Sequence, residues 1–388
     1  YWRAVLTAAS TPPAASAIGL PISAVVRPAS SSRRSTSRSA ATQIASARSP
    51  GEVDAHPGAA DLAASTAART SRGPATSSVA ITSSVAGSRR SSTGPSRRSN
   101  LTSLDGDPRC SFVEADVSES VPVDGPVDAV LNLASPASPV DFSRIPLQIL
   151  RAGSLGTLNT VELARRHGAR YLLASTSEVY GEPAVHPQPE SYWGNVNTIG
   201  PRACYDESKR FAEAAASTFA RSFGVDVGIA RIFNTYGPRM RADDGRVVSN
   251  FVVQALCGEP ITVHGDGSQT RSFCYVTDQA AALIALLDSG EPGPMNLGNP
   301  DEFTVEELAS MVLELTGSDS PLERRPLPED DPTQRRPDTA LARERLGWEP
   351  VVPLREGLVR TIEHFRRELG REGVDAAAAD ALLGVPTP

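Results

Sequence analysis

Lysine is almost absent from this 388-residue chain: Lys209 is the only lysine among 38 basic residues. Cysteine is also scarce, with four residues far apart and no C-x-x-C pair. That usage argues for reduced thiols and against a disulfide framework or a zinc site. The histidines show no metal-ligand spacing, and no apolar run reaches the roughly 18 residues of a membrane-spanning helix. We therefore expect a cytoplasmic protein without a metal site or a membrane segment.

Acidic residues are nearly absent from the first hundred residues, which hold 12 arginines against only Glu52, Asp54 and Asp61. The same segment lacks phenylalanine, methionine and cysteine and is rich in serine, alanine, threonine and proline. Such a composition cannot bury enough apolar surface to offset the entropy of ordering the chain. We therefore expect residues 1–100 to be largely disordered or irregular, with folded structure beginning near Leu101.

Helical and strand-like patterns alternate from Leu101 onward. The runs typical of buried strands are FVEADV (112–117), VDAVLNLA (127–134), YLLAST (171–176) and VDVGIARIFN (225–234). Helical patterns occupy 145–168 and 203–224, and both end at a glycine. This alternation predicts an α/β fold, a Rossmann-like doubly wound parallel sheet with its ligands at the carboxyl ends of the strands.

The later part of the chain has a more mixed pattern, typical of a smaller C-terminal domain. Residues 261–276 predict a hairpin around the Gly-Asp-Gly at 265–267, since glycine accepts the positive φ of a tight turn. Residues 304–317 and 354–370 predict amphipathic helices, the second with an apolar stripe at spacings of three and four. The alanine-rich tail beyond Gly370 is expected to fray.

Tyr205 and Lys209 stand four residues apart on the second predicted helix, so their side chains lie over the same face. A phenol is a weak base near neutral pH because its free pKa is about 10. A fixed cation beside it favours the phenolate and lowers that pKa. Lysine does this as a compact charge that also reaches a ribose hydroxyl, whereas arginine presents a broad planar fork. The pair indicates a proton-abstracting tyrosine, although the same spacing also occurs in surface pairs of amphipathic helices.

The stretch STSEVYG (175–181) follows a predicted strand directly, at the binding edge of the sheet. Thr176 could hydrogen-bond the substrate hydroxyl that Tyr205 deprotonates, and Glu178 could hold or activate a neighbouring group. Serine, threonine and glycine also cluster in ordinary turns at strand ends. The occurrence of both elements in this order favours a catalytic site.

Six stretches along the chain carry a family resemblance: LLASTSEVYGEP, YDESKR, ARIFNTYGPRM, DDGRVVSNFVVQAL, GDGSQTRSFCYV and RRPDTALARERLGWEP. With them, about Pro108 to Leu369 resembles the extended short-chain dehydrogenases/reductases of the NAD-dependent epimerase/dehydratase family. Within that family the chain is most similar to the UDP-glucuronate decarboxylases, or UDP-xylose synthases. Related sugar 4,6-dehydratases usually carry an aspartate before the glutamate, where this chain has Ser177.

The resemblance implies a NAD-dependent decarboxylation of UDP-glucuronate to UDP-xylose through a 4-keto intermediate. Tyr205 would take the proton of the C4 hydroxyl, Lys209 would hold the nicotinamide ribose and lower the tyrosine pKa, and Thr176 would orient O4. Glu178 and Arg335 would handle the carboxylate and the C5 proton. The family also implies a homodimer with a UDP-sugar substrate and no nucleic-acid partner. A UDP-sugar 4-epimerase, a 4,6-dehydratase and an inactive nucleotide-sugar-binding remnant stay open as alternatives.

Other binding residues carry over from the same resemblance. The cofactor set, beside Tyr205 and Lys209, is Asp116, Val117, Leu133, Ala134, Ser135 and Thr235. The substrate set is Arg151, Asn234, Asn250, His264 and Arg271. In these sets Asp116 and Val117 would bracket the adenine, and Arg271 would suit the diphosphate through its bidentate fork. His264 stands where many relatives have an aromatic ring near the uracil.

The resemblance also divides the chain into domains. We expect a Rossmann-like NAD domain at 101–235 and 268–300 and a nucleotide-sugar substrate domain at 236–267 and 301–370. A low-complexity segment at 1–100 stands in place of the first βαβ unit, and residues 371–388 form a tail.

The start of the chain departs from the family pattern. The family opens with a strand followed by glycines, which let the backbone approach the cofactor pyrophosphate at a helix N-terminus. This chain begins YWRAVLTAASTPPAASAIG, in which RAVLT fits a strand but no glycine precedes Gly19. The acidic residue that should hold the adenosine ribose is not identifiable. The first βαβ unit is therefore expected to be defective, with loss of NAD affinity and of activity.

Three explanations for the unusual segment stay open. It could be an Arg- and Ser-rich organelle leader, or a basic disordered tail. A shifted reading frame over roughly residues 8–95 explains more, because a G+C-rich gene read out of frame turns glycine codons into alanine and generates arginine, serine and proline. Resequencing the 5′ region tests this hypothesis.

Overall fold

The computed structural model describes residues 109–123 and 125–370, the single residues Asn100, Leu104 and Asp107, and the backbone of two strands further upstream. These strands, β1 (Ser23–Val26) and β2 (Val79–Ser83), precede Leu101, so the expectation that folded structure begins there is wrong for them. The disorder predicted elsewhere in 1–100, the strand predicted at RAVLT and the tail at 371–388 lie outside the described residues.

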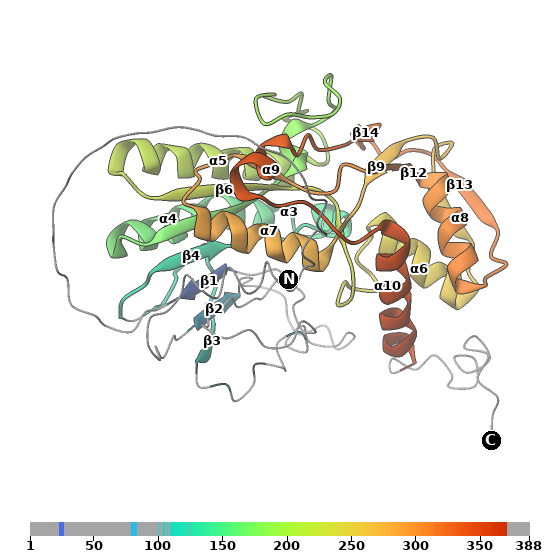
Figure 1. Ribbon diagram of the computed structural model, residues 1–388, viewed down its shortest axis with the longest axis horizontal. Coiled ribbons are helices and arrows are strands. Elements are labelled where there is room, and N and C mark those ends of the chain that lie inside the picture. Colours follow the sequence, from blue (N-terminus) through green and yellow to red (C-terminus); the bar gives the residue numbers. More distant parts are fainter. Residues whose placement is uncertain are drawn as a thin grey trace, which may run out of the picture.

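A seven-stranded sheet with the order β11-β6-β5-β4-β1-β2-β3 forms the centre of the fold (Figure 1). Its other strands are β3 (Cys110–Glu114), β4 (Ala129–Asn132), β5 (Arg170–Thr176), β6 (Val227–Ile232) and β11 (Met295–Leu297). The neighbouring pairs are parallel except those of β1, which runs antiparallel to both β2 and β4. The predicted doubly wound α/β fold is confirmed, with one reversed strand.

Helices cover both faces of this sheet. They are α2 (Pro139–Arg144), α3 (Pro146–Gly153), α4 (Leu155–His167), α5 (Ala203–Phe223), α7 (Val276–Ser289) and α9 (Ala340–Leu346). On one face α4 and α5 pack Val161 and Ala212 near Tyr171 of β5. On the other face α7 and α9 pack Leu283 and Ala342 near Leu172. The two faces use alternate residues of β5 because successive side chains of a strand point in opposite directions.

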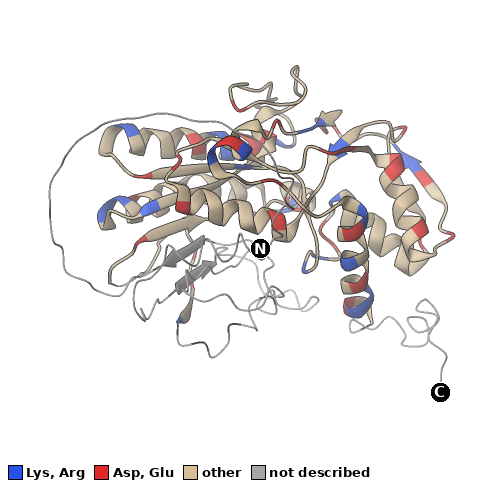
Figure 2. Cartoon of the chain, viewed as in Figure 1, with Lys and Arg blue, Asp and Glu red and all other residues tan. Residues whose placement is uncertain are grey.

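A second hydrophobic cluster lies beside the sheet, on the right in Figure 1. It is built by α6 (Val247–Cys257), α8 (Val305–Thr316) and α10 (Leu354–Leu369). The short strands around it are β7 (Thr235–Tyr236), β8 (Ile261–His264), β9 (Thr270–Ser272), β10 (Cys274–Tyr275), β12 (Glu302–Thr304), β13 (Leu322–Arg325) and β14 (Gln334–Arg335). On α10 the apolar stripe is buried, whereas Figure 2 shows charged residues of both signs along the same helix.

Two local predictions differ from the structure. The helix expected over 145–168 is two helices that meet at Ser154, where the backbone is distorted to φ −97° and ψ −77° and the hydroxyl bonds to the Leu150 carbonyl oxygen at 2.5 Å. The hairpin expected at 261–276 is wrong. Gly265 and Gly267 do have positive φ, but β8 pairs with β13 and β9 pairs with β12 and β14.

Both helices predicted in the later part form with clear termini. The first, α8, begins with a capping box between Thr304 and Glu307 and ends at Gly317 in the left-handed conformation. The second, α10, ends at Gly370. In the described part of the chain, no helix combines the length and the apolar character that crossing a membrane requires.

Candidate active site

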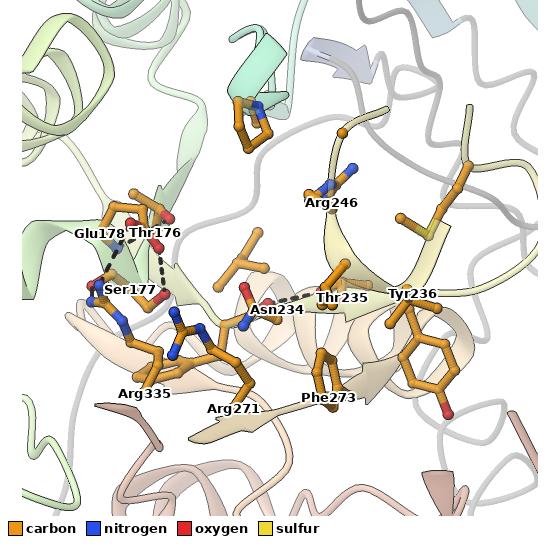
Figure 3. Close-up of a pocket in the computed structure, with 18 of the residues that line it drawn as sticks. Thr176, Ser177, Glu178, Asn234, Thr235, Tyr236, Arg246, Arg271, Phe273 and Arg335 are labelled. Atoms are coloured by element: carbon orange, nitrogen blue, oxygen red, sulfur yellow. Dashed lines mark hydrogen bonds and ion pairs between the residues drawn. The ribbon is translucent and has the colours of Figure 1, made fainter. Parts of the chain in front are cut away.

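A cavity of about 390 Å³ opens at the carboxyl ends of β4, β5 and β6. Its walls come from both hydrophobic clusters, since the loop after β6, the start of α6, β9 and β14 all contribute side chains. Figure 3 shows residues after β5 on one side of the cavity, facing arginines of β9 and β14. This position is where a doubly wound sheet places its ligands.

Tyr205 and Lys209 project from the first turns of α5 into this cavity. The Tyr205 ring stacks on Phe142 with centroids 5.0 Å apart. The Lys209 Nζ donates a hydrogen bond to the Ala174 carbonyl oxygen at 2.7 Å and lies 5.8 Å from the centroid of the Tyr205 ring. Both side chains are buried, each with 6% of its residue surface exposed. The expected pair is therefore brought together at the end of β5.

The electrostatics of this pair differ from the expectation. Burial raises the pKa of Tyr205 above its ordinary value, although a hydrogen bond to Thr176 and the charge of Arg246 act in the opposite direction. Burial also lowers the pKa of Lys209 to about 8, against the opposing charge of Glu213. The prediction of a lowered tyrosine pKa is wrong for this structure, because desolvation outweighs the hydrogen bond to Thr176 and the charge of Arg246.

Glu178 lies in the short 3₁₀ helix η2 (Ser177–Tyr180) directly after β5. Its Oε2 accepts hydrogen bonds from Arg202 Nη2 at 2.6 Å and from Arg335 Nη2 at 3.5 Å. Burial would raise the pKa of Glu178, but the charges of Arg335 and Arg202 outweigh burial and hold the pKa at about 2. Glu178 is therefore a carboxylate throughout the neutral range.

Arg335 is the largest fully buried side chain of the described residues. Its guanidinium donates to the backbone carbonyl oxygens of Ser177 and Gly181 as well as to Glu178. These contacts tie β14 to the turn after β5. The predicted neighbourhood of Glu178 and Arg335 is thus present, 157 residues apart in sequence.

Arg271 of β9 faces the same region. Its Nη2 donates to Asp331 Oδ2 at 3.0 Å and to the Pro332 carbonyl oxygen at 2.5 Å. Arg271 and Arg335 are register partners of the parallel pair β9–β14, so the two guanidinium groups start from adjacent backbone positions. Figure 3 shows both side chains on the side of the cavity opposite Arg246.

Three predicted substrate residues, Asn234, Asn250 and His264, line the same cavity, and so does the predicted cofactor residue Thr235. Thr235 Oγ1 lies 3.3 Å from Gln279 Oε1, and Asn250 Nδ2 donates to the Gly245 carbonyl oxygen at 3.2 Å. His264 Nδ1 lies 2.9 Å from the Pro326 carbonyl oxygen. These contacts orient the side chains of Thr235, Asn250 and His264, so a ligand here meets amides, a hydroxyl and an imidazole.

The predicted cofactor residues divide into two groups. Leu133 and Ser135 line the cavity with Tyr205 and Lys209, and Ala134 is buried between them. Asp116 and Val117 lie outside the lining. The Asp116 carboxylate accepts from the Ser118 backbone N–H and hydroxyl, and the Val117 carbonyl accepts from Asn159 at 2.9 Å. Their adenine contact therefore remains a prediction.

Arg151 is also outside the cavity. It lies near the end of α3 with 65% of its side chain exposed, 3.9 Å from Glu119. Its substrate contact stays a prediction that this position does not favour. Among the described residues, no group of three or more His, Cys, Asp and Glu side chains is arranged to hold a metal ion.

The residues in or beside the cavity that were not predicted from the sequence include Arg202, Asp206 and Asp331. Asp206 is buried, its Oδ1 has no hydrogen-bond partner in the described part of the chain, and burial together with the charge of Glu178 raises its pKa to about 8. A signal existed for Arg202, which stands immediately before the helix that carries Tyr205. Asp331 had none beyond its acidic neighbourhood in PEDDP.

Known proteins share much of this chain. The model of the NAD dependent epimerase/dehydratase family matches residues 80–298. UDP-glucuronic acid decarboxylase 1 from Arabidopsis thaliana is 52% identical over 276 residues, which cover 71% of this chain and 63% of that protein. The enzyme of the same name from Danio rerio is 52% identical over 273 residues, 70% of this chain and 65% of that protein. The matched part thus spans less than two thirds of these relatives.

A solved structure is similar as well. A dTDP-glucose 4,6-dehydratase from Streptomyces venezuelae, crystallised with NAD, superposes with a TM-score of 0.64. It is 26% identical, and the match covers 71% of this chain and 85% of that one.

Proposed function

Because this chain belongs to the NAD dependent epimerase/dehydratase family, we propose that it decarboxylates UDP-glucuronate to UDP-xylose with NAD as its cofactor. The observation that carries the proposal is the contact of Glu178 with Arg335 and Arg202 beside Tyr205 and Lys209. Cations next to a catalytic tyrosine suit a sugar that carries a carboxylate. The relatives named UDP-glucuronic acid decarboxylase support the same substrate.

The residues at one end of the cavity fit the nicotinamide half of NAD. The Ser135 hydroxyl is buried with no hydrogen-bond partner among the described residues, so it has an unused polar atom for a ligand. Lys209 would hold the ribose, and Leu133 and Thr235 would flank the ring. NAD supplies an acceptor for the C4 hydride and later returns it, so the cofactor is not consumed.

The protein's own residues move the protons. Tyr205 takes the proton of the C4 hydroxyl, and Thr176, hydrogen-bonded to the same phenol, orients O4. The 4-ketone is β to the sugar carboxylate, so the electrons of the breaking C5–C6 bond move into the ketone as carbon dioxide leaves. Tyr205 then returns its proton to O4 when the ketone is reduced. A raised tyrosine pKa favours this last, proton-donating role.

Glu178 and Arg335 act at the sugar carboxylate and at C5. Because Glu178 stays ionised at neutral pH, it orients a proton source such as water toward C5 rather than donating a proton itself. Arg335 is fixed by backbone carbonyls and by Glu178, so it presents its charge without reorganisation.

A second candidate function is an inactive nucleotide-sugar-binding protein. One observation favours it: β1 occupies the place next to β4 in the reverse direction, so the carboxyl end of β1 lies at the edge of the sheet away from the cavity. The glycine loop that the family uses for the pyrophosphate is also missing from the sequence.

Product analysis separates these functions. Purified protein with UDP-glucuronate and NAD should release carbon dioxide and UDP-xylose, and the Tyr205→Phe variant should release neither. A UDP-hexuronate of changed C4 configuration would identify a 4-epimerase instead. A folded protein that binds UDP but forms no product would support the inactive remnant.

The proposal also covers the oligomeric state, the location in the cell and the division into domains. Exposed apolar side chains of α3 and α4, among them Leu147 and Leu155, support a homodimer formed through these helices. The four cysteines are free, which supports a cytoplasmic location. We also retain the division into a NAD domain and a substrate domain, with the cavity between their clusters.

A further inference from the structure

Five charged side chains form a closed ring in the cavity wall. Arg202 Nη2 lies 2.6 Å from Glu178 Oε2, and Arg202 Nη1 lies 3.5 Å from Asp331 Oδ1. Asp331 Oδ2 in turn lies 3.0 Å from Arg271, and Glu178 lies 3.5 Å from Arg335. The ring closes on the backbone, because Arg271 and Arg335 are register partners on β9 and β14. All five residues line the cavity.

The ring carries one more positive than negative charge, since three guanidinium groups face two carboxylates. Asp206 is the next charged neighbour of Arg202, and its raised pKa of about 8 keeps it largely neutral at pH 7. It therefore does not cancel the surplus.

The surplus charge is partly withdrawn from water. The exposed fractions of the five side chains run from 1% for Arg335 to 27% for Asp331. An unbalanced charge in such a place is costly unless an anion pairs with it. A ligand that brings one carboxylate to the ring would balance it, whereas a neutral sugar would leave it uncompensated.

We propose that Arg202 is a specificity-determining residue that selects nucleotide sugars bearing a carboxylate, and that Asp331 weakens the same selection. This inference rests on the proposed function for its substrate class. Arg202 supplies one of the three positive charges and makes the shortest of the ion pairs, the one to the ionised Glu178. Asp331 pairs with Arg202 Nη1 and with Arg271 Nη2, so it competes with a ligand anion for these two guanidinium groups.

Opposite effects of two substitutions test the charge argument. Titration calorimetry on the full chain without NAD would compare UDP-glucuronate with UDP-glucose. In Arg202→Gln the preference for UDP-glucuronate should fall about tenfold, since one partly buried charge is lost. In Asp331→Asn the preference should rise several-fold, because the surplus grows. A merely structural role predicts loss of binding in both variants, which would overturn the inference.

Two control variants keep the test independent of folding. Arg202→Lys keeps the charge and should retain the preference within about threefold, by the same electrostatic argument. Arg336 is the neighbour of Arg335 in sequence and lies outside the ring of five charges; its Nε donates to the Pro300 carbonyl oxygen. The Arg336→Gln variant should leave the preference for UDP-glucuronate unchanged. A change as large as that of Arg202→Gln would overturn the inference.

The binding data also separate this inference from the proposed function. If UDP-glucuronate and UDP-glucose bind the wild type equally, the inference about Arg202 fails but the proposed function does not, because nucleotide-sugar binding is intact. If neither these ligands nor UDP binds the folded wild type, the proposed function fails and takes the inference with it.

Discussion

Lys209 lies where a lysine is needed for reasons of space as well as charge. Its ammonium group is buried between α5 and the end of β5 and donates one hydrogen bond to the Ala174 carbonyl oxygen. A guanidinium is wider and carries five N–H donors in a fixed plane, most of which would have no acceptor here. That explains why lysine persists at this position in a chain that otherwise uses arginine.

We predict that Lys209→Arg lowers the rate of UDP-xylose formation by about 100-fold or more, because the wider side chain displaces Tyr205 from the position that its proton transfer requires. The rate is measured by product chromatography, with the same concentrations of UDP-glucuronate and NAD for both proteins. Arg221→Lys, on the outer last turn of α5, makes the reverse exchange and should change the rate little. A Lys209→Arg enzyme that keeps most of its activity would contradict the spatial argument.

A second prediction at the residue scale concerns Asp206 and the pH dependence of the free energy of unfolding. Burial and the charge of Glu178 raise its pKa from the ordinary 3.8 to about 8. Between these values the folded protein holds a proton that the unfolded chain has released, so the free energy of unfolding falls as pH rises from about 4 to about 8.

The Asp206→Asn variant should remove that pH dependence. Its free energy of unfolding should match the wild type near pH 4 and exceed it by about 1 kcal/mol or more at pH 8, as linkage requires. Urea unfolding at both pH values measures the difference. The exposed Asp301→Asn serves as the control. An Asp206→Asn protein less stable than the wild type at pH 8 would refute the buried neutral carboxyl.

At the scale of single elements, the turn after β5 builds the site. Gly181 ends η2 with φ 60° and ψ −140°, and a Cβ there would lie 1.9 Å from the Asn195 carbonyl oxygen. The Gly181 carbonyl also accepts a hydrogen bond from Arg335 at 3.0 Å. The glycine therefore lets the backbone turn back so that Glu178 and Arg335 meet.

Gly181→Ala should destabilise the protein by on the order of 3 kcal/mol, because backbone strain adds to a clash with backbone atoms. Gly168→Ala is a matched control, since Gly168 has φ 61° but no atom lies within 4 Å of the position that its Cβ would take. It should cost only about 1 kcal/mol of conformational strain. Thermal and urea unfolding would show the contrast, and equal costs would refute the role of the close approach.

At the scale of the whole molecule, the reversed strand decides what the sheet can bind. In the β1–β4 register Ala24 pairs with Leu131 and Val26 with Ala129, whereas β4 runs on toward Leu133 at the cavity. The carboxyl end of β1 therefore lies at the edge of the sheet away from the cavity. A dinucleotide site needs the opposite direction, since its pyrophosphate sits where a parallel strand meets a helix N-terminus.

We predict that NAD binds this chain weakly, with a Kd above about 1 mM, near −4 kcal/mol. UDP should bind more tightly, because the cavity residues for it belong to other elements. Titration calorimetry of both ligands measures the ratio. Micromolar NAD binding would show that the reversed strand does not control cofactor affinity.

The sequence by itself determined the alternation of strands and helices, the helices 203–224 and 354–370, and the strand-end position of Thr176 and Glu178. These follow from periods of two or 3.6 residues and from side chains within one element, which neighbours in sequence encode. Tyr205 and Lys209 share a face for the same local reason.

Only the tertiary structure decided the partners and the pKa directions. Glu178 meets Arg202 from 24 residues away and Arg335 from 157 residues away. The pairing of β8 with β13 and the reversal of β1 are likewise non-local. Burial, which raises the pKa of Tyr205 despite the charge of Arg246, exists only once the sheet and the second cluster close over the cavity. Strand order and desolvation depend on contacts between distant segments, and no local pattern contains them.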